Sequence, residues 1–342
     1  MSENTPLIQT IDLKQHFPLR AGLFGRPSLW VKAVDGITID IPHRSVLGLV
    51  GESGSGKSTF GRAVMGLDSP TSGTIKFDGM DLASASKDEM KALRRRMQMV
   101  FQDPFSSLNP RMSVNETLGV PLRFHERDLS RAARRDRAAE MLERVGLPAA
   151  YIDRFPHEFS GGQRQRIGIA RALMVHPDFI MADEVVSALD VSVQAQVLNL
   201  FAKLQRDMQL TMLFITHDLA VVGHVSDFVA VMYLGRIVEL APTRALFSAP
   251  QHPYTEALLS AAPTPEARDR AKRIVLKGDI PSAVNPPSGC PFRTRCLYAL
   301  DACAADLPAL REVAPGHKTA CIRDDLTLAS ATQQSVPTRD TA

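Results

Sequence analysis

The sequence lacks the features of a secreted or membrane-spanning protein. Its apolar runs, such as FVAVMYL, are far shorter than the roughly 18 residues that span a bilayer. The start, MSENTPLIQT, has neither the basic residues nor the apolar core of a signal peptide. With a net charge of only +3, nothing in the overall charge requires nucleic acid as a partner. We therefore expect a protein that stays in the cytoplasm.

Cysteine and tryptophan are scarce. The 342 residues include one tryptophan and four cysteines, and the cysteines all lie within residues 290–321. They are too few and too clustered for the disulfide scaffold of a small secreted protein. The remaining composition, with 44% hydrophobic and 23% charged residues, is typical of a globular protein with about two domains.

The strongest motif is GESGSGKST at residues 51–59. It fits the phosphate-loop pattern G-x-x-x-x-G-K-[ST] and stands between an apolar segment and a helix-compatible one, a setting that an ordinary glycine-rich turn does not require. Its backbone N–H groups can point at phosphate oxygens, Lys57 can reach the β and γ phosphates, and Ser58 can ligate Mg²⁺. The predicted nucleotide-binding residues are Gly51, Glu52, Ser53, Gly54, Ser55, Gly56, Lys57, Ser58 and Thr59.

Buried strands and amphipathic helices alternate along most of the chain. The stretches MQMVF, FIMAD, TMLFI and FVAVMYL read as buried strands, and helices are predicted at 87–96, 162–175 and 191–208. Such alternation predicts an α/β fold around a parallel sheet. Residues 103–159 interrupt it with a loop rich in proline and serine and a long amphipathic helix, which predicts an inserted helical subdomain. After about residue 250 the chain becomes rich in proline and loops.

Polar residues follow three of the predicted strands. Asp183 ends FIMAD and is placed to hold Mg²⁺, and Glu184 beside it is the candidate base for a hydrolytic water. Gln102 follows MQMVF and His217 follows TMLFIT. Each alone could be ordinary loop polarity. Because the carboxyl ends of parallel strands line the ligand crevice, Gln102 is placed to contact the metal or the water and His217 the γ-phosphate.

The segment FSGGQRQR offers a second anion-binding helix N-terminus, opened by Ser160, Gly161 and Gly162. Such a feature is redundant for one nucleotide but useful if it covers a nucleotide held by another molecule.

The order of GESGSGKST, FQDP, FSGGQ, MADE, SALD and ITHD resembles that of ATP-binding cassette (ABC) ATPases over about residues 7–250. The resemblance implies a P-loop NTPase ABC ATPase core, with a RecA-like parallel sheet and an antiparallel β subdomain. It implies that Lys57, Gln102, Glu184 and His217 take part in ATP hydrolysis. Mg²⁺ would be held by Ser58, Gln102 and Asp183. The residues that would complete a partner subunit's ATP site are Ser160, Gly161, Gly162, Gln163 and Asp190.

The changes in pattern along the chain set the expected domain boundaries. Residues 1–102 and 160–250 are predicted to form the ATPase core, residues 103–159 the helical subdomain, residues 251–325 an extension with the four cysteines, and residues 326–342 a disordered tail.

The interpretation of two positions, Trp30 and Val185, depends on comparison with the family pattern. Trp30 is the candidate for the aromatic that stacks on adenine, although Phe17 and Phe24 lie close by and a lone tryptophan is as often a packing residue. Val185 stands where the family usually has proline. This loosens the backbone constraint on Glu184 without removing its carboxylate, so we expect activity to survive.

Further segments, among them QHPYTEALLSA and NPPSGCPFRTRC, resemble the ATPase subunits of oligopeptide/dipeptide importers nearly end to end, and the N-terminal insertion resembles their F-type subunit. The resemblance implies ATP-driven import of peptides or similar small solutes at the cytoplasmic face of the bacterial inner membrane. The implied partners are a second, D-type ATPase subunit, two transmembrane permeases and an extracytoplasmic solute-binding protein, with no nucleic acid.

The cysteines follow the pattern C-x5-C-x6-C-x17-C, at Cys290, Cys296, Cys303 and Cys321. Four thiols on a loop-rich segment could ligate an iron–sulfur cluster or zinc, or stay unliganded as small buried hydrophobes. The spacing is not that of a zinc ribbon. Similar cysteine sets in the peptide-importer ATPases favour a 4Fe–4S cluster.

Two other functions stay open. One is a soluble ABC ATPase that acts on nucleic acid or the ribosome, although the coiled-coil insertion, zinc modules within the cassette or second cassette that would favour it are absent from the sequence. The other is a regulatory ATPase subunit whose cysteine region senses redox state or metal.

Overall fold

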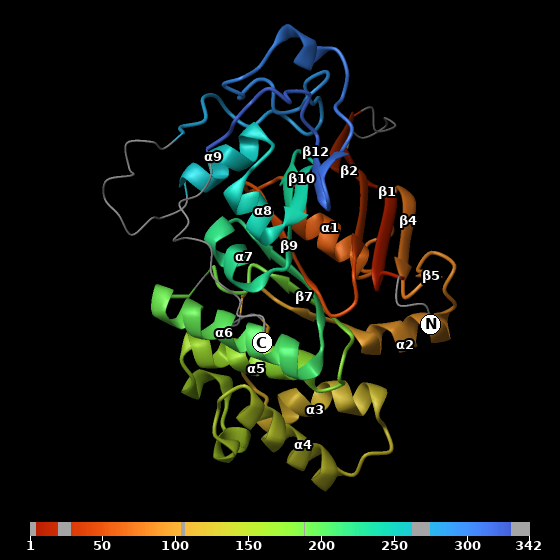
Figure 1. Cartoon of the computed structure of the whole chain (residues 1–342). Helices are drawn as coiled ribbons and strands as arrows, with labels where there is room; N and C mark the ends of the chain where they lie inside the picture. The colour runs from red at the N-terminus through yellow and green to blue at the C-terminus, as the bar shows by residue number, and fades with distance from the viewer. Residues whose placement is uncertain (1–4, 20–28, 104–106, 188, 262–273, 330–342) are drawn as a thin grey trace. The chain divides into compact units, whose positions relative to one another are not determined.

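The computed structural model describes residues 5–19, 29–103, 107–187, 189–261 and 274–329 (Figure 1). The chain divides into two compact units. The first unit comprises residues 1–83 and 215–342, and the second comprises residues 84–214.

An antiparallel sheet forms the N-terminal part of the first unit. Its strand order is β2-β1-β4-β5, with β1 spanning Ile8–Leu19, β2 Leu29–Ile41, β4 Ser72–Phe77 and β5 Met80–Asp81. The register of β1 against β2 shifts near Asp12, whose φ of 44° is left-handed, so the strand bends there. This sheet confirms the predicted antiparallel β subdomain.

The central strands of the first unit run in the order β11-β12-β10-β9-β3. Their bounds are β3 Val46–Val50, β9 Phe228–Tyr233, β10 Arg236–Pro242, β11 Arg311–Ala314 and β12 His317–Thr319. Strands β3 and β9 pair in parallel, and every residue of β3 is buried, as its apolar sequence VLGLV predicts. Strand β10 pairs antiparallel with both β9 and β12, so the C-terminal extension adds strands to the core sheet.

The helices of the first unit are α1 (Lys57–Val64), α7 (Leu219–Val225), α8 (Thr243–Ser248) and α9 (Pro253–Ala261). Side chains of α7, α8 and α9 pack with β9 in one apolar cluster, which also takes in Tyr233, Tyr254 and Phe292. Since Phe292 lies between the first two cysteines, the extension shares its core with the sheet.

The second unit contains the parallel pair β6 and β7 and several capped helices. The elements are α2 (Lys87–Arg96), β6 (Met97–Val100), α3 (Val114–His125), α4 (Arg131–Arg144), α5 (Gly161–Leu173), β7 (Phe179–Asp183) and α6 (Val191–Met208). Strand β8 (Thr211–Thr216) begins in this unit and ends in the first. Helices α2, α3 and α5 each begin with a capping box, in which a serine side chain and a Glu or Gln three residues later satisfy each other's backbone N–H groups.

The combination of parallel core strands, an antiparallel sheet and flanking helices confirms the predicted α/β class. The predicted helices at 87–96 and 191–208 and the strand at 179–183 have the same bounds in the structure. None of the helices in the described ranges combines the length and the apolar character that a bilayer crossing requires.

The region after residue 250 is more regular than the sequence suggested. It contains helix α9 and strands β11 and β12. Strand β11 pairs with β12, and β12 is held to β10 by backbone pairing and by a buried contact between His317 and Glu239 (2.7 Å). Most of the predicted disordered tail, residues 330–342, lies outside the described residues. Its first residues are packed, with Leu328 only 9% exposed and the Ala329 N–H donating to Glu256 (2.7 Å).

Candidate functional site

The glycine-rich loop lies between buried β3 and the start of α1. Gly56 is the N-cap of α1 with a φ of 105°, and a Cβ there would lie 2.0 Å from the carbonyl oxygen of Ala33. A Cβ on Gly51 would lie 2.2 Å from the carbonyl oxygen of Met232. Both positions therefore accept only glycine, and the neighbouring strands β2 and β9 hold the loop in a closed turn.

Lys57 is folded back over this loop. Its ammonium group donates to the carbonyl oxygens of Gly51 (2.8 Å) and Glu52 (3.0 Å), and the residue is 5% exposed. In contrast, Ser53, Gly54 and Ser58 are exposed. A buried cation close to exposed loop residues at a helix N-terminus is a suitable arrangement for binding a polyphosphate.

Gln102 and Glu184 meet in the second unit. The side-chain amide of Gln102 donates to a carboxylate oxygen of Glu184 (2.9 Å), although the two residues are 82 positions apart. Asp183 ends β7 and is 8% exposed. The structure thus brings Gln102 and Glu184, which follow two different strands, into contact, while their roles as metal or water ligand and as base stay predictions.

Glu184 has an unusual backbone. Its φ is 47°, a left-handed conformation that costs free energy for a residue with a Cβ. The turn that follows is fixed by Ser187, whose hydroxyl donates to the Glu184 carbonyl oxygen (2.8 Å), and by the burial of Val185. The Glu184 carboxylate accepts the Gln102 hydrogen bond in this backbone conformation, with valine rather than proline at position 185.

His217 directly follows β8 and is exposed. Asp218 next to it accepts from the Ala220 N–H (2.8 Å) and so begins α7. His217 and the phosphate loop belong to the first unit, whereas Gln102 and Glu184 belong to the second. The predicted meeting of all these groups around one nucleotide stays a prediction.

The predicted signature residues open helix α5. The Ser160 hydroxyl accepts from the Gln163 N–H (3.4 Å), and the Gln163 side chain accepts from the Ser160 N–H (3.0 Å). Gly162 lies against α6, since a Cβ there would come 2.4 Å from a methyl group of Val193. Asp190, the N-cap of α6, is exposed and its side chain makes no cap hydrogen bond. Exposed polar residues thus stand at two helix N-termini of the second unit.

Trp30 stands on β2, opposite Pro18 of β1, and is 42% exposed. Three residues later the same strand supplies Ala33, which touches the loop at Gly56. Phe17 is also exposed, at 41%, and Phe24 lies outside the described residues. The choice of Trp30 as the adenine-stacking residue stays a prediction.

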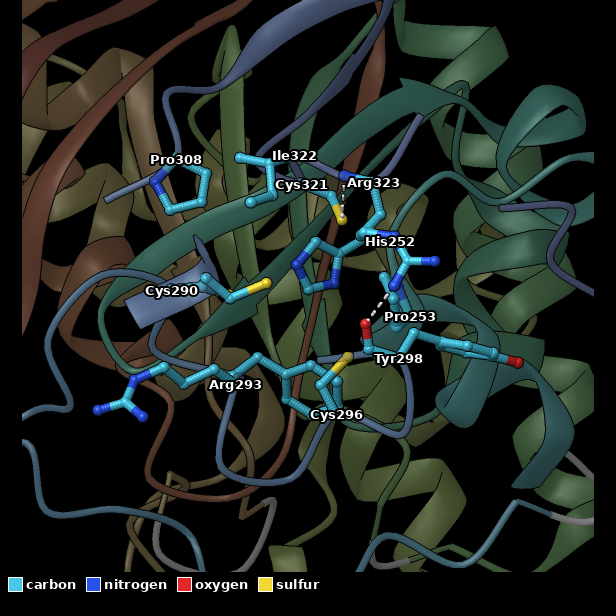
Figure 2. Close-up of a pocket in the computed structure, with 12 residues that line it drawn as sticks. His252, Pro253, Cys290, Arg293, Cys296, Tyr298, Pro308, Cys321, Ile322 and Arg323 are labelled. Carbon is cyan, nitrogen blue, oxygen red and sulfur yellow. Dashed lines mark hydrogen bonds between the residues drawn. The ribbon is translucent and has the colours of Figure 1, made fainter. Parts of the chain in front are cut away.

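The four cysteines line one small cavity of about 20 Å³ with His252 and Phe292. Figure 2 shows the sulfur atoms of Cys290, Cys296 and Cys321 around the same space as His252. Burial raises the pKa of the Cys290 thiol to about 11 and also raises the pKa values of Cys296 and Cys321. Within the described ranges, no three His, Cys, Asp or Glu side chains are grouped closely enough to hold a metal ion.

Two residues near the candidate site were not found from the sequence. Arg295 and Tyr254 both bind Glu52 of the glycine-rich loop. Their partner lies 243 and 202 positions away in the chain, so no local pattern could indicate these contacts.

Comparisons with known proteins cover nearly all of the chain. The ABC transporter family matches residues 34–187, and the family described as oligopeptide/dipeptide transporter, C-terminal region, matches residues 238–303. A putative peptide import ATP-binding protein of Brucella ovis is 56% identical, over 94% of this chain and 99% of its own length. The oligopeptide transport ATP-binding protein AppF of Bacillus subtilis is 51% identical, over 92% of this chain and 96% of its own length.

Solved structures agree with the fold. The ATP-binding cassette MJ0796, in a dimeric post-hydrolysis state with ADP and Pi, superposes with a TM-score of 0.61 at 28% identity, covering 69% of this chain and 99% of that one. The protein cbiO1 of Clostridium perfringens, part of the transporter complex cbiONQ, has a TM-score of 0.61 at 26% identity, with 71% of this chain and 91% of that one covered.

Proposed function

The chain belongs to the ABC transporter ATP-binding proteins that carry the oligopeptide/dipeptide transporter C-terminal region. We propose that it hydrolyses ATP to energise the import of peptides or similar small solutes. The observation that carries the proposal is that peptide-import relatives match the C-terminal extension as well as the ATPase core. A generic cassette would match the core alone.

The chemistry follows from the two groups of residues described above. Lys57 and the loop N–H groups would bind the phosphates of ATP, and His217 would contact the γ-phosphate. Ser58, Gln102 and Asp183 offer the oxygen ligands that Mg²⁺ prefers, and the ion would neutralise charge on the phosphates. Glu184, held by Gln102, would orient and deprotonate the attacking water.

A second anion-binding helix N-terminus at the signature residues would be redundant for the nucleotide of their own subunit. Ser160, Gly161, Gly162 and Gln163, together with Asp190, would complete the ATP site of a partner ATPase, so that ATP binding joins two cassettes and hydrolysis separates them. We propose that the partner is a related D-type chain. The helical subdomain at 103–159 would contact two permeases at the cytoplasmic face of the membrane, and a solute-binding protein would deliver the cargo outside.

Replacing Ser160 by arginine is expected to abolish the ATP-dependent dimer while sparing ATP binding by the single subunit. The reason is that a large cation would fill the surface that faces the partner's nucleotide. Size-exclusion chromatography of this chain together with the D-type partner, with ATP and in the Glu184→Gln background, measures the dimer. The matched control is Ser130→Arg, which removes an equivalent N-cap at α4, whose loss costs about 1 kcal/mol of stability. If Ser160→Arg formed as much ATP-dependent dimer as Ser130→Arg and the wild type, the shared ATP site would be contradicted.

We further propose that the four cysteines hold a 4Fe–4S cluster. Their donor set fits, because four thiols line one cavity, and thiolates are the usual ligands of such clusters. A single zinc ion requires its ligands about 2.3 Å away around one point, whereas a cluster spreads its thiolates more widely. The spacing C-x5-C-x6-C-x17-C is also not that of a zinc ribbon, which favours a cluster over zinc. Bound iron would deprotonate thiols whose pKa values burial raises.

Replacing Cys303 by serine is expected to remove the brown colour of the anaerobically purified protein and to destabilise the extension. Cys303 is buried and lines the cavity, so serine removes one of the four thiolate ligands from the interior of the extension. Iron and sulfide analysis with the absorption spectrum measures the cluster. A colourless wild-type protein without iron, purified in the absence of oxygen, refutes the cluster, and stoichiometric zinc would assign the cysteines to that metal.

The import function is tested by purifying the tagged chain from membranes in mild detergent. The proposal predicts recovery of two permeases and a second ATPase, with ATP hydrolysis stimulated by peptide. Recovery of nucleic acid or ribosomes without membrane proteins would instead support the soluble ABC ATPase.

A further inference from the structure

The C-terminal extension holds the phosphate loop through Glu52. The guanidinium of Arg295 donates to both carboxylate oxygens of Glu52, at 2.6 and 3.0 Å. This two-point geometry fixes the direction of the carboxylate as well as its distance. The side chain of Arg295 is only 7% exposed and that of Glu52 27%, so water screens this ion pair much less than a pair on the surface.

A second contact fixes the backbone of the same residue. The Glu52 N–H donates to the hydroxyl oxygen of Tyr254 (2.9 Å), which belongs to α9. The Tyr254 ring is fully buried and packs edge-on against Tyr233, with ring centres 4.8 Å apart, and against Phe292 at 5.2 Å. The hydroxyl group is therefore rigidly placed, and it fixes the position of the first turn of the loop.

The residues that make these contacts lie beside the cysteine cavity. Phe292 and Arg295 both belong to the short loop CPFRTRC, which is bounded by Cys290 and Cys296. The Arg295 N–H donates to the Phe292 carbonyl oxygen (2.9 Å), so the loop is a tight turn with one side chain in the core and one on Glu52. The loop thus links the cysteine cavity to the glycine-rich loop.

Glu52 in turn supports the candidate phosphate-binding cation. Its carbonyl oxygen accepts from the ammonium group of Lys57 (3.0 Å) and from the Ser55 N–H (3.2 Å). A carboxylate released from Arg295 would stand next to this ammonium group, compete for it and repel the phosphates of ATP. The ion pair with Arg295 neutralises that charge and holds it in one direction.

We propose that Arg295 and Tyr254 are positioning residues of the ATP site, which hold the phosphate loop in its binding conformation by fixing the carboxylate and the backbone of Glu52. This inference rests on the proposed function only in so far as the loop binds ATP. It assigns to the extension a direct part in nucleotide affinity, in addition to any ligand of its cysteines.

The test compares ATP affinity and turnover in the full-length subunit within its transporter complex. Arg295→Ala is expected to raise the Kd and KM for ATP about tenfold, with a smaller change in kcat, because a charged hydrogen bond that organises the binding loop is lost. Arg295→Lys, which keeps the charge but not the two-point geometry, is expected to fall between wild type and Arg295→Ala. Adding Glu52→Gln to Arg295→Ala should recover part of the affinity, since the unpaired charge is removed.

Two further variants separate positioning from folding. Tyr254→Phe keeps the buried ring and removes only the hydroxyl, so KM should rise severalfold with little change in melting temperature. It also serves if Arg295→Ala does not fold. Arg293→Ala is the matched control, because Arg293 lies in the same loop but donates to the Ser288 carbonyl oxygen (2.9 Å), and its KM should equal that of the wild type.

Three results would overturn the proposal. They are an unchanged KM in Arg295→Ala or Tyr254→Phe, an equal loss of affinity in Arg293→Ala, and a loss in Arg295→Ala that Glu52→Gln does not alter. A wild-type protein that binds no ATP would refute the proposed function itself, which distinguishes that failure from these.

Discussion

Replacing Lys57 by alanine is expected to abolish ATP binding. The ammonium group is buried against the Gly51 and Glu52 carbonyl oxygens, close to the exposed loop residues Ser53 and Gly54. Removing a unit charge about 4 Å from a phosphate, in a partly screened site, costs about 4 kcal/mol, which corresponds to roughly a thousandfold loss of affinity. Isothermal titration calorimetry with Mg²⁺-free ATP and with Mg-ATP measures the effect.

The control for this prediction is Lys87→Ala. Lys87 is the first residue of α2, as Lys57 is of α1, so both variants replace a lysine at a helix start by a better helix former. Only Lys57→Ala should lose ATP. Normal ATP affinity in Lys57→Ala would contradict the assignment of residues 51–59 as the phosphate loop.

Replacing Glu184 by glutamine is expected to reduce ATP hydrolysis about a hundredfold or more, because a positioned general base contributes at least that factor. Glutamine has the same shape, so the contact with Gln102 and the left-handed turn can persist while the base is lost. ATP binding should be retained, and the ATP-bound dimer should accumulate. Steady-state phosphate release and nucleotide binding measure the two effects separately.

Glu140→Gln is the control for Glu184→Gln, since Glu140 is an exposed residue that pairs with Arg144 on the surface of α4. Its hydrolysis rate should equal that of the wild type. Unchanged hydrolysis in Glu184→Gln would refute the role of base. Lost hydrolysis with unimpaired transport would favour a regulatory subunit whose ATP turnover is secondary.

The parts of the fold that the sequence predicted well are those specified by local patterns. Helix α2 has a serine cap, a glutamate three residues later and a Pro-free interior, and strand β7 is a short apolar run that ends in an acidic residue. Each pattern is complete within one element, so its bounds could be predicted from the sequence alone.

The elements that were missed depend on distant residues or on an exception to a local rule. Helix α3 contains Pro121, although proline normally ends a helix. The helix continues through Pro121 because Leu118 and Leu122, on either side of it, are fully buried in the core. Strand β12 has only three residues. It is stabilised by β10, about 80 positions earlier, whose backbone pairs with β12 and whose residue Glu239 places a buried carboxylate against His317. No periodicity in such a short segment predicts a strand.

In the candidate site, too, local motifs were predictable from the sequence and contacts between distant residues were not. The motifs singled out the glycine-rich loop, Gln102 and Glu184, since each follows a recognisable strand, but the hydrogen bond between Gln102 and Glu184 appears only in the structure. The hydrogen bonds of Arg295 and Tyr254 to Glu52 were not predictable, because they form only when the extension packs against β9 and the Tyr233 side chain. The left-handed backbone of Glu184 likewise has no signature in the residues around it.

The most direct test of the proposed function is ATP hydrolysis and tracer-peptide uptake in vesicles that contain the complete transporter, measured with and without the solute-binding protein and peptide. We predict that peptide raises the hydrolysis rate, that labelled peptide is taken up, and that Glu184→Gln in this subunit abolishes both signals. Hydrolysis that does not respond to peptide, in vesicles that take up none of it, would contradict the assignment of this chain to peptide import.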